Sequence, residues 1–395
     1  MFRKVLKVLL TLFLFVGVMQ AQTVIELTKA GELKEKLGSD VITDLSVKGP
    51  MGKADFQALI TAQRKNIEKL DLSAVVLSGD TLPNKAIAGY TKLTTLVLPK
   101  GVAYLNSQAI FKCPELISIA LSEENKHFVV KENVLYTINQ DTLLVCPGGK
   151  AGEFIVPETV NAIGEYAFYA NQKITSVKLP ESVKEIKGNA FALMDLLESI
   201  NLENVEILGV QAFSGSPLKN VVLTNVQTIF RGAFEACEDL ETITLGENVT
   251  QIGRRFIFKY INDRSSLKSI TCLAAIPPRI IGYLGNSAYC DDGVLYVPKG
   301  SLAAYQTASG WSEVKDIREI EPTSNETIVS EGNRVAAIQG GIRVDAQSPV
   351  SVSVYTANGM LVKQQQVAGS EEISLAKGLY YVVIGKNKAV ALKVK

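Results

Sequence analysis

The side chains that most often carry out catalysis are sparse in this 395-residue chain. His127 is its single histidine, and it is flanked by Lys126 and Phe128. A general base needs a partner group held by a rigid scaffold, and the common zinc sites need a second histidine or a cysteine pair. No GxSxG, GxxxxGK(S/T) or GxGxxG loop is present to hold a nucleophile or a phosphate. We therefore expect His127 to be a surface-loop residue, and the chain to have no catalytic residue, no metal site and no cofactor.

The elements that would have to position any site are repeats. Residues 151–256 contain one pattern five times, aligned on Phe168, Phe191, Phe213, Phe234 and Phe256. These aromatic residues are 23, 22, 21 and 22 residues apart, a spacing within the range of leucine-rich repeats. Each copy has a short apolar strand, a turn and a second apolar pair, and most copies then have an Ala-Phe pair. One such unit cannot bury its own core, but stacked units can, so the pattern predicts a leucine-rich-repeat solenoid.

The five cysteines follow the repeats more than any redox motif. Cys113 and Cys237 each come three residues after the aromatic position of their repeat, so we expect buried core thiols. Cys272 and Cys290 both belong to the last, irregular repeat and either pair or stay free, while Cys146 lies in an apolar strand with no obvious mate. An odd number of cysteines leaves at least one unpaired.

The N-terminal segment, which ends at Asn66, differs from the repeats. Residues 1–21 combine a basic start, an apolar run over 8–18 and a small residue, Ala21, before Gln22, which is typical of a secretory signal peptide. Residues 22–66 contain two helical stretches and a strand. Because an open solenoid would expose its core at the end, we expect this segment to be an α/β N-terminal cap. The solenoid would then extend over residues 67–320.

One turn of the array is interrupted. Pro99 and Pro157 occupy equivalent positions, but the segment between them has room for two repeat units and about 12 additional residues. The inserted segment, at about 122–153, has three short apolar runs and a turn at residues 139–141. This pattern predicts a hairpin that projects from the stack.

The tail changes to an alternating pattern. Residues 321–332 are polar without an apolar period, as in a linker. Residues 333–395 contain seven short runs of alternating apolar and polar residues, and Asn358-Gly359 between two of them is a strong hairpin signal. The pattern predicts a small antiparallel β-sandwich.

Two parts of the sequence resemble known families. The repeat ITSVKLPESVKEIKGNAF and the closing segment LYVPKGSLAAYQTASGW resemble the BspA-like leucine-rich repeats of bacterial surface proteins. In the tail, VSVYTANGMLV, AKGLYYVVIG and ALKVK are similar to the C-terminal sorting domains of Bacteroidetes type IX secretion cargo. The second resemblance implies that the tail delivers or tethers the protein, and the alternative is a plain accessory sandwich.

The positions that the repeats leave free form the candidate binding face. The residues on either side of the middle apolar position of each strand should point away from the core. A partner-binding surface on this face would use small polar groups, namely Ser176, Lys178, Ser199, Asn201, Asn220, Thr242, Thr244, Ser269 and Thr271. The alternative is that small hydroxyl and β-branched residues simply suit tightly stacked strands.

The resemblance implies an exported protein of the cell surface, outer membrane or extracellular space, without catalytic activity, that adheres to host extracellular-matrix proteins, host cell-surface proteins or other bacteria. A glycan-binding accessory of a polysaccharide-uptake system is the alternative, which stacked aromatic rings on the exposed face would favour. A hydrolase with converging carboxylates is a third hypothesis, and no motif supports it. The net charge of +1 gives no reason to expect a nucleic-acid partner. An apolar run of about 11 residues is too short to span a bilayer, so we expect no membrane span in the mature chain.

Overall fold

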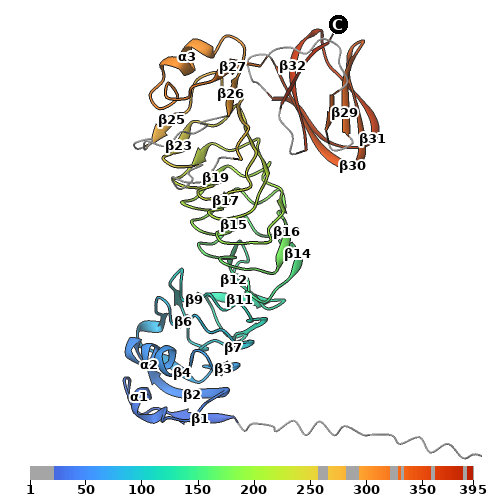
Figure 1. Ribbon diagram of the computed structural model, residues 1–395. Helices are drawn as coiled ribbons and strands as arrows, with labels where there is room; N and C mark the ends of the chain where they lie inside the picture. Colours follow the sequence, from blue (N-terminus) through green and yellow to red (C-terminus); the bar gives the residue numbers. More distant parts are fainter. Residues whose placement is uncertain are drawn as a thin grey trace, which may run out of the picture.

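The structure, a computed structural model, describes residues 22–256, 266–281, 293–320, 328–330, 333–356, 361–385 and 389–394. The predicted signal peptide, Cys290, most of the predicted linker and the Asn358-Gly359 turn lie outside these residues. The molecule is a parallel β-solenoid of about 12 turns with an N-terminal α/β cap and a C-terminal antiparallel sheet. Figure 1 shows the cap at one end of the stack and the C-terminal sheet beside the last turns.

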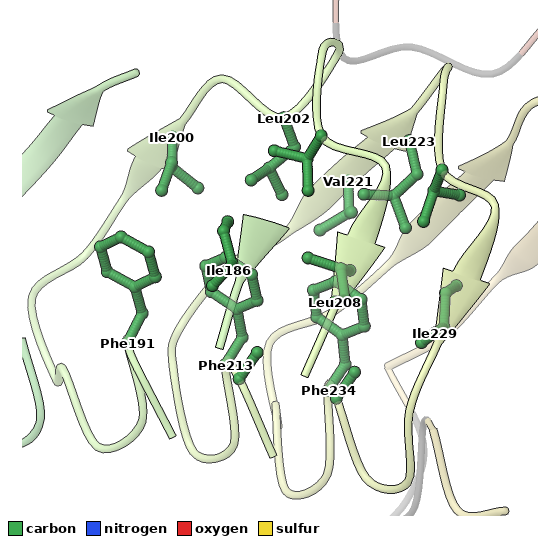
Figure 2. Close-up of a cluster of buried hydrophobic side chains, with 14 of the residues drawn as sticks. Ile186, Phe191, Ile200, Leu202, Leu208, Phe213, Val221, Leu223, Ile229 and Phe234 are labelled. Atoms are coloured by element: carbon green, nitrogen blue, oxygen red, sulfur yellow. The ribbon is translucent and has the colours of Figure 1, made fainter. Parts of the chain in front are cut away.

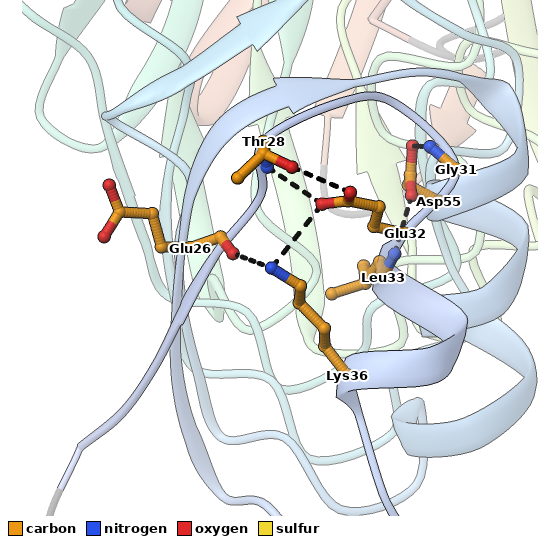
Figure 3. Close-up of polar contacts among 7 residues, drawn as sticks. All are labelled: Glu26, Thr28, Gly31, Glu32, Leu33, Lys36 and Asp55. Carbon is orange, nitrogen blue, oxygen red and sulfur yellow. Dashed lines mark hydrogen bonds and ion pairs between the residues drawn. The ribbon is translucent and has the colours of Figure 1, made fainter.

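The cap is built around one buried carboxylate. Its elements are β1 (Thr23–Glu26), α1 (Leu33–Lys36), β2 (Asp44–Met51) and α2 (Lys53–Gln63). Asp55 accepts hydrogen bonds from the backbone N–H groups of Gly31 (2.8 Å), Leu33 (3.1 Å) and Gly52 (2.9 Å), and its side chain is buried. The carboxylate therefore joins the starts of both helices (Figure 3).

A second, half-buried carboxylate orders the loop before α1. Glu32 accepts hydrogen bonds from the backbone N–H and hydroxyl of Thr28, at 2.9 and 2.8 Å, and pairs with Lys36 at 3.5 Å. The Thr28 hydrogen bonds, the backbone one first, lower the pKa of Glu32 from 4.5 to about 2. Figure 3 shows these contacts side by side with those of Asp55.

The solenoid has an inner wall of parallel strands and an outer wall that is parallel after its first three strands, which pair antiparallel. The inner wall contains β3 (Lys69–Asp71), β7 (Thr95–Val97) and β10 (Ser118–Ala120), then β14 (Gly152–Ile155), β16 (Ile174–Lys178) and β18 (Ser199–Ile200), and finally β20 (Asn220–Leu223), β22 (Thr242–Leu245), β24 (Ser269–Cys272), β26 (Val294–Val297) and β27 (Ile317–Glu319). The nine-stranded outer wall contains β11 (Phe128–Lys131), β12 (Val134–Thr137), β13 (Thr142–Val145), β15 (Ala162–Ile163), β17 (Glu185–Ile186), β19 (Ile207–Leu208), β21 (Thr228–Ile229), β23 (Gln251–Gly253) and β25 (Arg279–Ile281).

Short elements complete the turns. Near the cap, β4 (Val75–Leu77) pairs with β2, and η1 (Ser78–Asp80) follows it. Two further pairs join β5 (Thr81–Leu82) to β8 (Tyr104–Leu105) and β6 (Ile87–Ala88) to β9 (Ile110–Phe111). At the other end, α3 (Leu302–Thr307) lies between β26 and β27.

The core consists of ladders of like residues, as the repeat pattern predicts. Phe168, Phe191, Phe213 and Phe234 stack in a row with ring centroids 4.8, 5.2 and 5.3 Å apart and ring planes within 18° of parallel. The labelled residues of Figure 2 show this aromatic row below the apolar rows of the strands. Each ring is buried, so a turn gains its core only from its neighbours. The predicted leucine-rich-repeat solenoid is confirmed.

The prediction that the inserted hairpin projects from the stack is wrong. In β12, Val134 and Tyr136 pack into the core that contains the phenylalanine row, and Leu135 packs into the core on the cap side. All three side chains are at most 3% exposed. Because the strand is apolar on both faces, it lies between two cores and joins them. The hairpin is a part of the stack.

The C-terminal sheet has longer strands than predicted. It contains β28 (Ile328–Ser330), β29 (Asn333–Ile338), β30 (Gly341–Thr356), β31 (Leu361–Ser374), β32 (Gly378–Ile384) and β33 (Val390–Val394). Two pairs of predicted short strands merge into the single strands β30 and β31. The predicted break within each pair is only a shift in the pairing register, as between Ala346 and Val350. Residues on both sides of that irregularity, such as Val344 and Val352, share one buried core.

Four cysteines lie within the described residues, and all four are buried thiols. Cys113 and Cys237 are in the core, as predicted. Cys272 lies 3.1 Å from the hydroxyl of Tyr305, which donates a hydrogen bond to it. Burial raises the pKa of the Cys272 thiol to about 11, so it is protonated and unreactive at neutral pH.

Candidate partner-binding groove

The C-terminal sheet packs directly on the inner wall of the solenoid. Tyr355, Tyr381 and Val383 of the sheet form a buried cluster with Val222 and Leu273 of the solenoid, together with Ile320, Ala389 and the partly buried Tyr296. The Tyr381 hydroxyl accepts a hydrogen bond from the Lys299 N–H at 3.2 Å, and Glu247 accepts one from the Leu361 N–H at 2.7 Å. The tail is therefore docked on the array by apolar and polar contacts.

This contact divides the predicted binding residues into two groups. Thr244, Ser269 and Thr271 are buried, with 3%, 7% and 2% of their surfaces exposed. Thr244 is in register with Val222 on one side and Thr271 on the other, and Thr271 is in register with Tyr296. Both ends of this row, Val222 and Tyr296, belong to or pack on the docked cluster, so the C-terminal sheet covers Thr244 and Thr271. Ser269 lies in the neighbouring row, in register with Thr242 and Val294, and is buried as well. The prediction places them on an open face, and there it is wrong.

The remaining predicted residues lie near or in an open groove. Ser176, Lys178, Ser199, Asn201 and Asn220 line it, and the half-buried Thr242 donates a hydrogen bond to Asn220 at 2.7 Å. The groove has a volume of about 1350 Å³ and lies between the inner wall of the solenoid and the C-terminal sheet. The structure thus brings together five of the nine predicted residues in one cavity.

The two walls of the groove differ in chemistry. The solenoid wall carries more carboxylates than lysines, namely Glu153, Glu181, Asp195, Glu198, Glu203 and Asp239 against Lys178 and Lys219. The opposite wall carries amides and hydroxyls, including Asn333, Ser348, Ser351 and the run Gln364, Gln365 and Gln366. No aromatic side chain lines the groove within the described residues. The arrangement can form many hydrogen bonds and ion pairs, but it offers no stacking surface.

Several of the predicted polar residues also stabilise the array. The Asn201 amide exchanges two hydrogen bonds with the backbone of Leu179, at 2.7 and 2.8 Å, and so replaces a rung of the ladder. Lys178 pairs with Glu153 at 2.9 Å. The inner wall is divided next to Asn201, because β18 and β20 belong to different sheets. The alternative that these residues serve the stacking of the strands therefore accounts for part of the predicted set.

Sequence reasoning missed the sheet side of the groove. On β31, the glutamines at 364, 365 and 366 are exposed or half-buried, and among the described strands β31 pairs with β30 alone. Three consecutive glutamines in a strand with an alternating pattern are the only local signal. Nothing in that run indicates that it faces Ser199, which belongs to a much earlier part of the chain.

In the part of the chain that the structure describes, no group of three His, Cys, Asp or Glu side chains could hold a metal ion. His127 is exposed, as predicted, and its backbone N–H donates a hydrogen bond to Asn125 at 2.9 Å. Among the same residues, no helix has the length and apolar character needed to cross a membrane.

The fold and the repeats define the class of protein. Residues 62–140 and 148–263 match the BspA type leucine rich repeat region, in 6 copies. These residues are thus BspA-type leucine-rich repeats. No curated protein is significantly similar to the chain in sequence.

Among solved structures, the pneumococcal vaccine antigen PcpA shares the fold, with a TM-score of 0.51, 18% identity and 71% of each chain covered. Two other structures are less similar. A leucine-rich repeat protein from Eubacterium ventriosum has 18% identity, a TM-score of 0.42 and coverage of 66% of this chain and 87% of that one. A leucine rich cell surface protein from Faecalibacterium prausnitzii has 18% identity, a TM-score of 0.41 and coverage of 63% and 83%.

Proposed function

We propose that this protein is an exported, non-catalytic surface protein that binds a protein partner in the groove between its repeat array and its C-terminal sheet. The groove is the observation that carries the proposal, because its volume of about 1350 Å³ is framed by polar side chains from two units. Curved repeat arrays commonly offer extended binding surfaces of this kind. The partner we propose is a host matrix protein, a host cell-surface protein or a protein of another bacterium.

The chemistry of the walls supports a protein partner over a neutral glycan. Carboxylates on one side and amides on the other suit a protein surface with complementary charge and many hydrogen bonds. The groove lacks the aromatic rings that a neutral sugar would stack on, within the described residues. Glycan binding is a second candidate function because aromatic rings gather at a different site on the solenoid.

The C-terminal sheet has two roles in this proposal. It supplies one wall of the groove, and it delivers or tethers the protein, as its resemblance to sorting domains implies. Deleting residues 333–395 should leave the solenoid folded, strand the protein in the periplasm, and expose the docked apolar residues Val222 and Leu273. Protease shaving of cells that express the truncated chain tests the sorting role, and finding that chain at the surface would refute it.

The binding role is tested by filling the groove. We expect Ser199→Arg and Gln364→Arg, one on each wall, to reduce binding of the full chain to immobilised host matrix proteins by roughly tenfold, since each places a large cation in the contact area. Ser309→Arg, at an exposed position after α3, is the matched control and should bind as the wild type does. Wild-type adhesion that both groove variants retain in full would contradict the proposal.

A further inference from the structure

Three aromatic rings gather on the surface at the interrupted turn. Phe111 and Tyr169 stack with centroids 4.8 Å apart and planes at 26°, and Tyr166 meets both rings edge-on at 5.7 and 5.3 Å. We call Phe111, Tyr166 and Tyr169 the aromatic trio. A shallow hollow of about 30 Å³ lies among the trio and the backbone around Pro114 and Pro147. It shares no lining residue with the groove.

The repeat pattern explains why the trio forms at this place. Phe111 and Tyr169 both come directly after the core aromatic position of their turns, where other copies have Ala88, Ala192, Ser214 and Glu235. The turn between them is the interrupted one, and its residues 146–148 line the hollow instead of filling it. The two rings therefore approach each other across the interruption.

Tyr166 occupies a position that does not suit a tyrosine. Its φ is 60°, and the equivalent positions of the next three copies hold Asn189, Gln211 and Gly232 with φ between 54° and 65°. Asn and Gly tolerate this left-handed region, whereas a bulky side chain there is an outlier. Gln211 adopts the same φ, so the left-handed turn belongs to the repeat and does not by itself select a tyrosine. The tyrosine is therefore not explained by the local backbone.

The trio does more than seal the gap in the stack. None of its three residues belongs to the buried core clusters, and all three remain partly exposed. In the part of the chain that the structure describes, neither the Tyr166 nor the Tyr169 hydroxyl forms a hydrogen bond to another residue. A plug would be buried and apolar, whereas this cluster presents ring surface and two hydroxyl groups to solvent.

A lysine supplies a positive charge at the same place. The Lys112 ammonium lies 5.6 Å from the ring centroids of both Phe111 and Tyr169, within cation–π distance. Within the described residues Lys112 forms no ion pair with a carboxylate. The site therefore combines apolar ring surface, hydroxyl groups and an unneutralised cation.

We propose that the trio and Lys112 bind an acidic sugar residue, a pyranose that carries a carboxylate. The hollow is too shallow to take up a whole side chain, so the ligand must lie on it, and the C–H face of a pyranose is flat enough to pack on the rings. The tyrosine hydroxyls are placed to exchange hydrogen bonds with sugar hydroxyls, and Lys112 pairs with the carboxylate. This inference rests on the second candidate function, glycan binding at these rings, and it is independent of the protein binding proposed for the groove.

The test uses trigalacturonate as the probe and its methyl ester as the matched neutral ligand, with calorimetry on the full chain. We expect trigalacturonate to bind, the ester to bind at least about fivefold more weakly, and added salt to remove that difference. Tyr166→Ala should weaken trigalacturonate binding by roughly tenfold or more, because aromatic anchors dominate such contacts. Lys112→Met should lower the affinity for trigalacturonate to that for the ester, and it should leave the affinity for the ester unchanged.

Control variants separate binding from folding. Tyr104→Ala removes an aromatic ring that is 65% exposed elsewhere on the solenoid, and it should change neither affinity. Lys112→Met keeps the apolar stem, so it reports on the charge even if Tyr166→Ala proves unstable. Any one of three results would overturn the inference: trigalacturonate does not bind, the acid and the ester bind equally well, or the Lys112→Met variant binds the acid as tightly as the wild type does.

Discussion

Two stretches of the inner wall use similar residues for different purposes, namely the open end around β16 and β18 and the covered end around β22 and β24. Around β16 and β18, small polar groups such as Ser176 and Ser199 line an open groove. Around β22 and β24, Thr244 and Thr271, two positions further along their strands than the equivalents of these serines, are buried where the C-terminal sheet docks. A stripe of small polar side chains can therefore be a binding surface or a packing surface, and the element that covers it decides which. Substitutions at the open end, at the covered end and in the cap should affect the molecule differently.

The largest effect should come from a charge placed at the covered end. Thr271→Lys would put an ammonium group beneath the docked sheet, and we expect a loss of about 3 kcal/mol in the free energy of unfolding, since a buried unpaired charge is costly. The opposite change at the open end, Lys178→Thr, should shift stability by about 0.5 kcal/mol or less. Urea denaturation of both variants measures the contrast, and equal losses would show that the two ends do not differ.

A second effect should follow from emptying the contact itself. Tyr381 is fully buried between the sheet and the array and is not a member of the sheet's own core. Tyr381→Ala should therefore destabilise docking by about 2–3 kcal/mol, in the lower part of the range for large-to-small changes. Limited proteolysis should then cleave between array and sheet more readily. Lys377→Ala, an exposed position before β32, is the control, and enhanced cleavage in that variant would argue against a specific role of Tyr381.

The third effect concerns the opposite end of the solenoid, where the cap has its own buried polar group. Asp55→Ala would leave the N–H groups of Gly31, Leu33 and Gly52 without their acceptor. We expect a loss of about 2 kcal/mol, in line with the cost of unsatisfied buried donors. Hydrogen exchange should rise in α1 and α2 only. A rise in β22 or β24 as well would mean that the cap and the covered end unfold together.

The smallest effect is a pH dependence confined to the cap. The pKa of Glu32 is lowered to about 2 in the folded chain from an ordinary 4.5, so its contribution is fully present above about pH 4.5 and is lost as the pH falls toward 2. Glu32→Gln should remove this part of the acid sensitivity, and its difference in stability from the wild type should be smallest at the acid end of that window. Thermal melts across the window measure it, and identical pH profiles for variant and wild type would contradict the assignment.

The solenoid could be predicted because its determinants are local and repeated. The phenylalanine row follows from a spacing that is visible in the sequence, and each ring stacks on the next one. The position of the hairpin could not be inferred in the same way. A hairpin on the surface would have one buried, apolar face, whereas β12 is apolar on both faces and fits a position between two cores better. Only the stack shows that two cores are there.

The groove depends on contacts that no periodic pattern records. Ser176 and Ser199 could be identified as outward-facing from their places in the strand. Thr244 is in register with Val222, and Val222 packs with Tyr355 and Tyr381 of the C-terminal sheet, which are distant from it in the sequence. Propensity and spacing report on neighbours in one turn, so a contact between the array and the tail lies beyond them.

The most direct test of the central claim is the accessibility of the two ends to a small thiol reagent. Thr244→Cys and Ser176→Cys, each in a Cys290→Ser background, would be labelled with a maleimide in the full chain. The four other cysteines are buried. Docking of the sheet predicts that Thr244→Cys reacts roughly a hundredfold more slowly than Ser176→Cys, because it reacts only when the contact opens. Adding Tyr381→Ala should bring the two rates together, whereas equal rates in the full chain itself would contradict the covered face and the groove that depends on it.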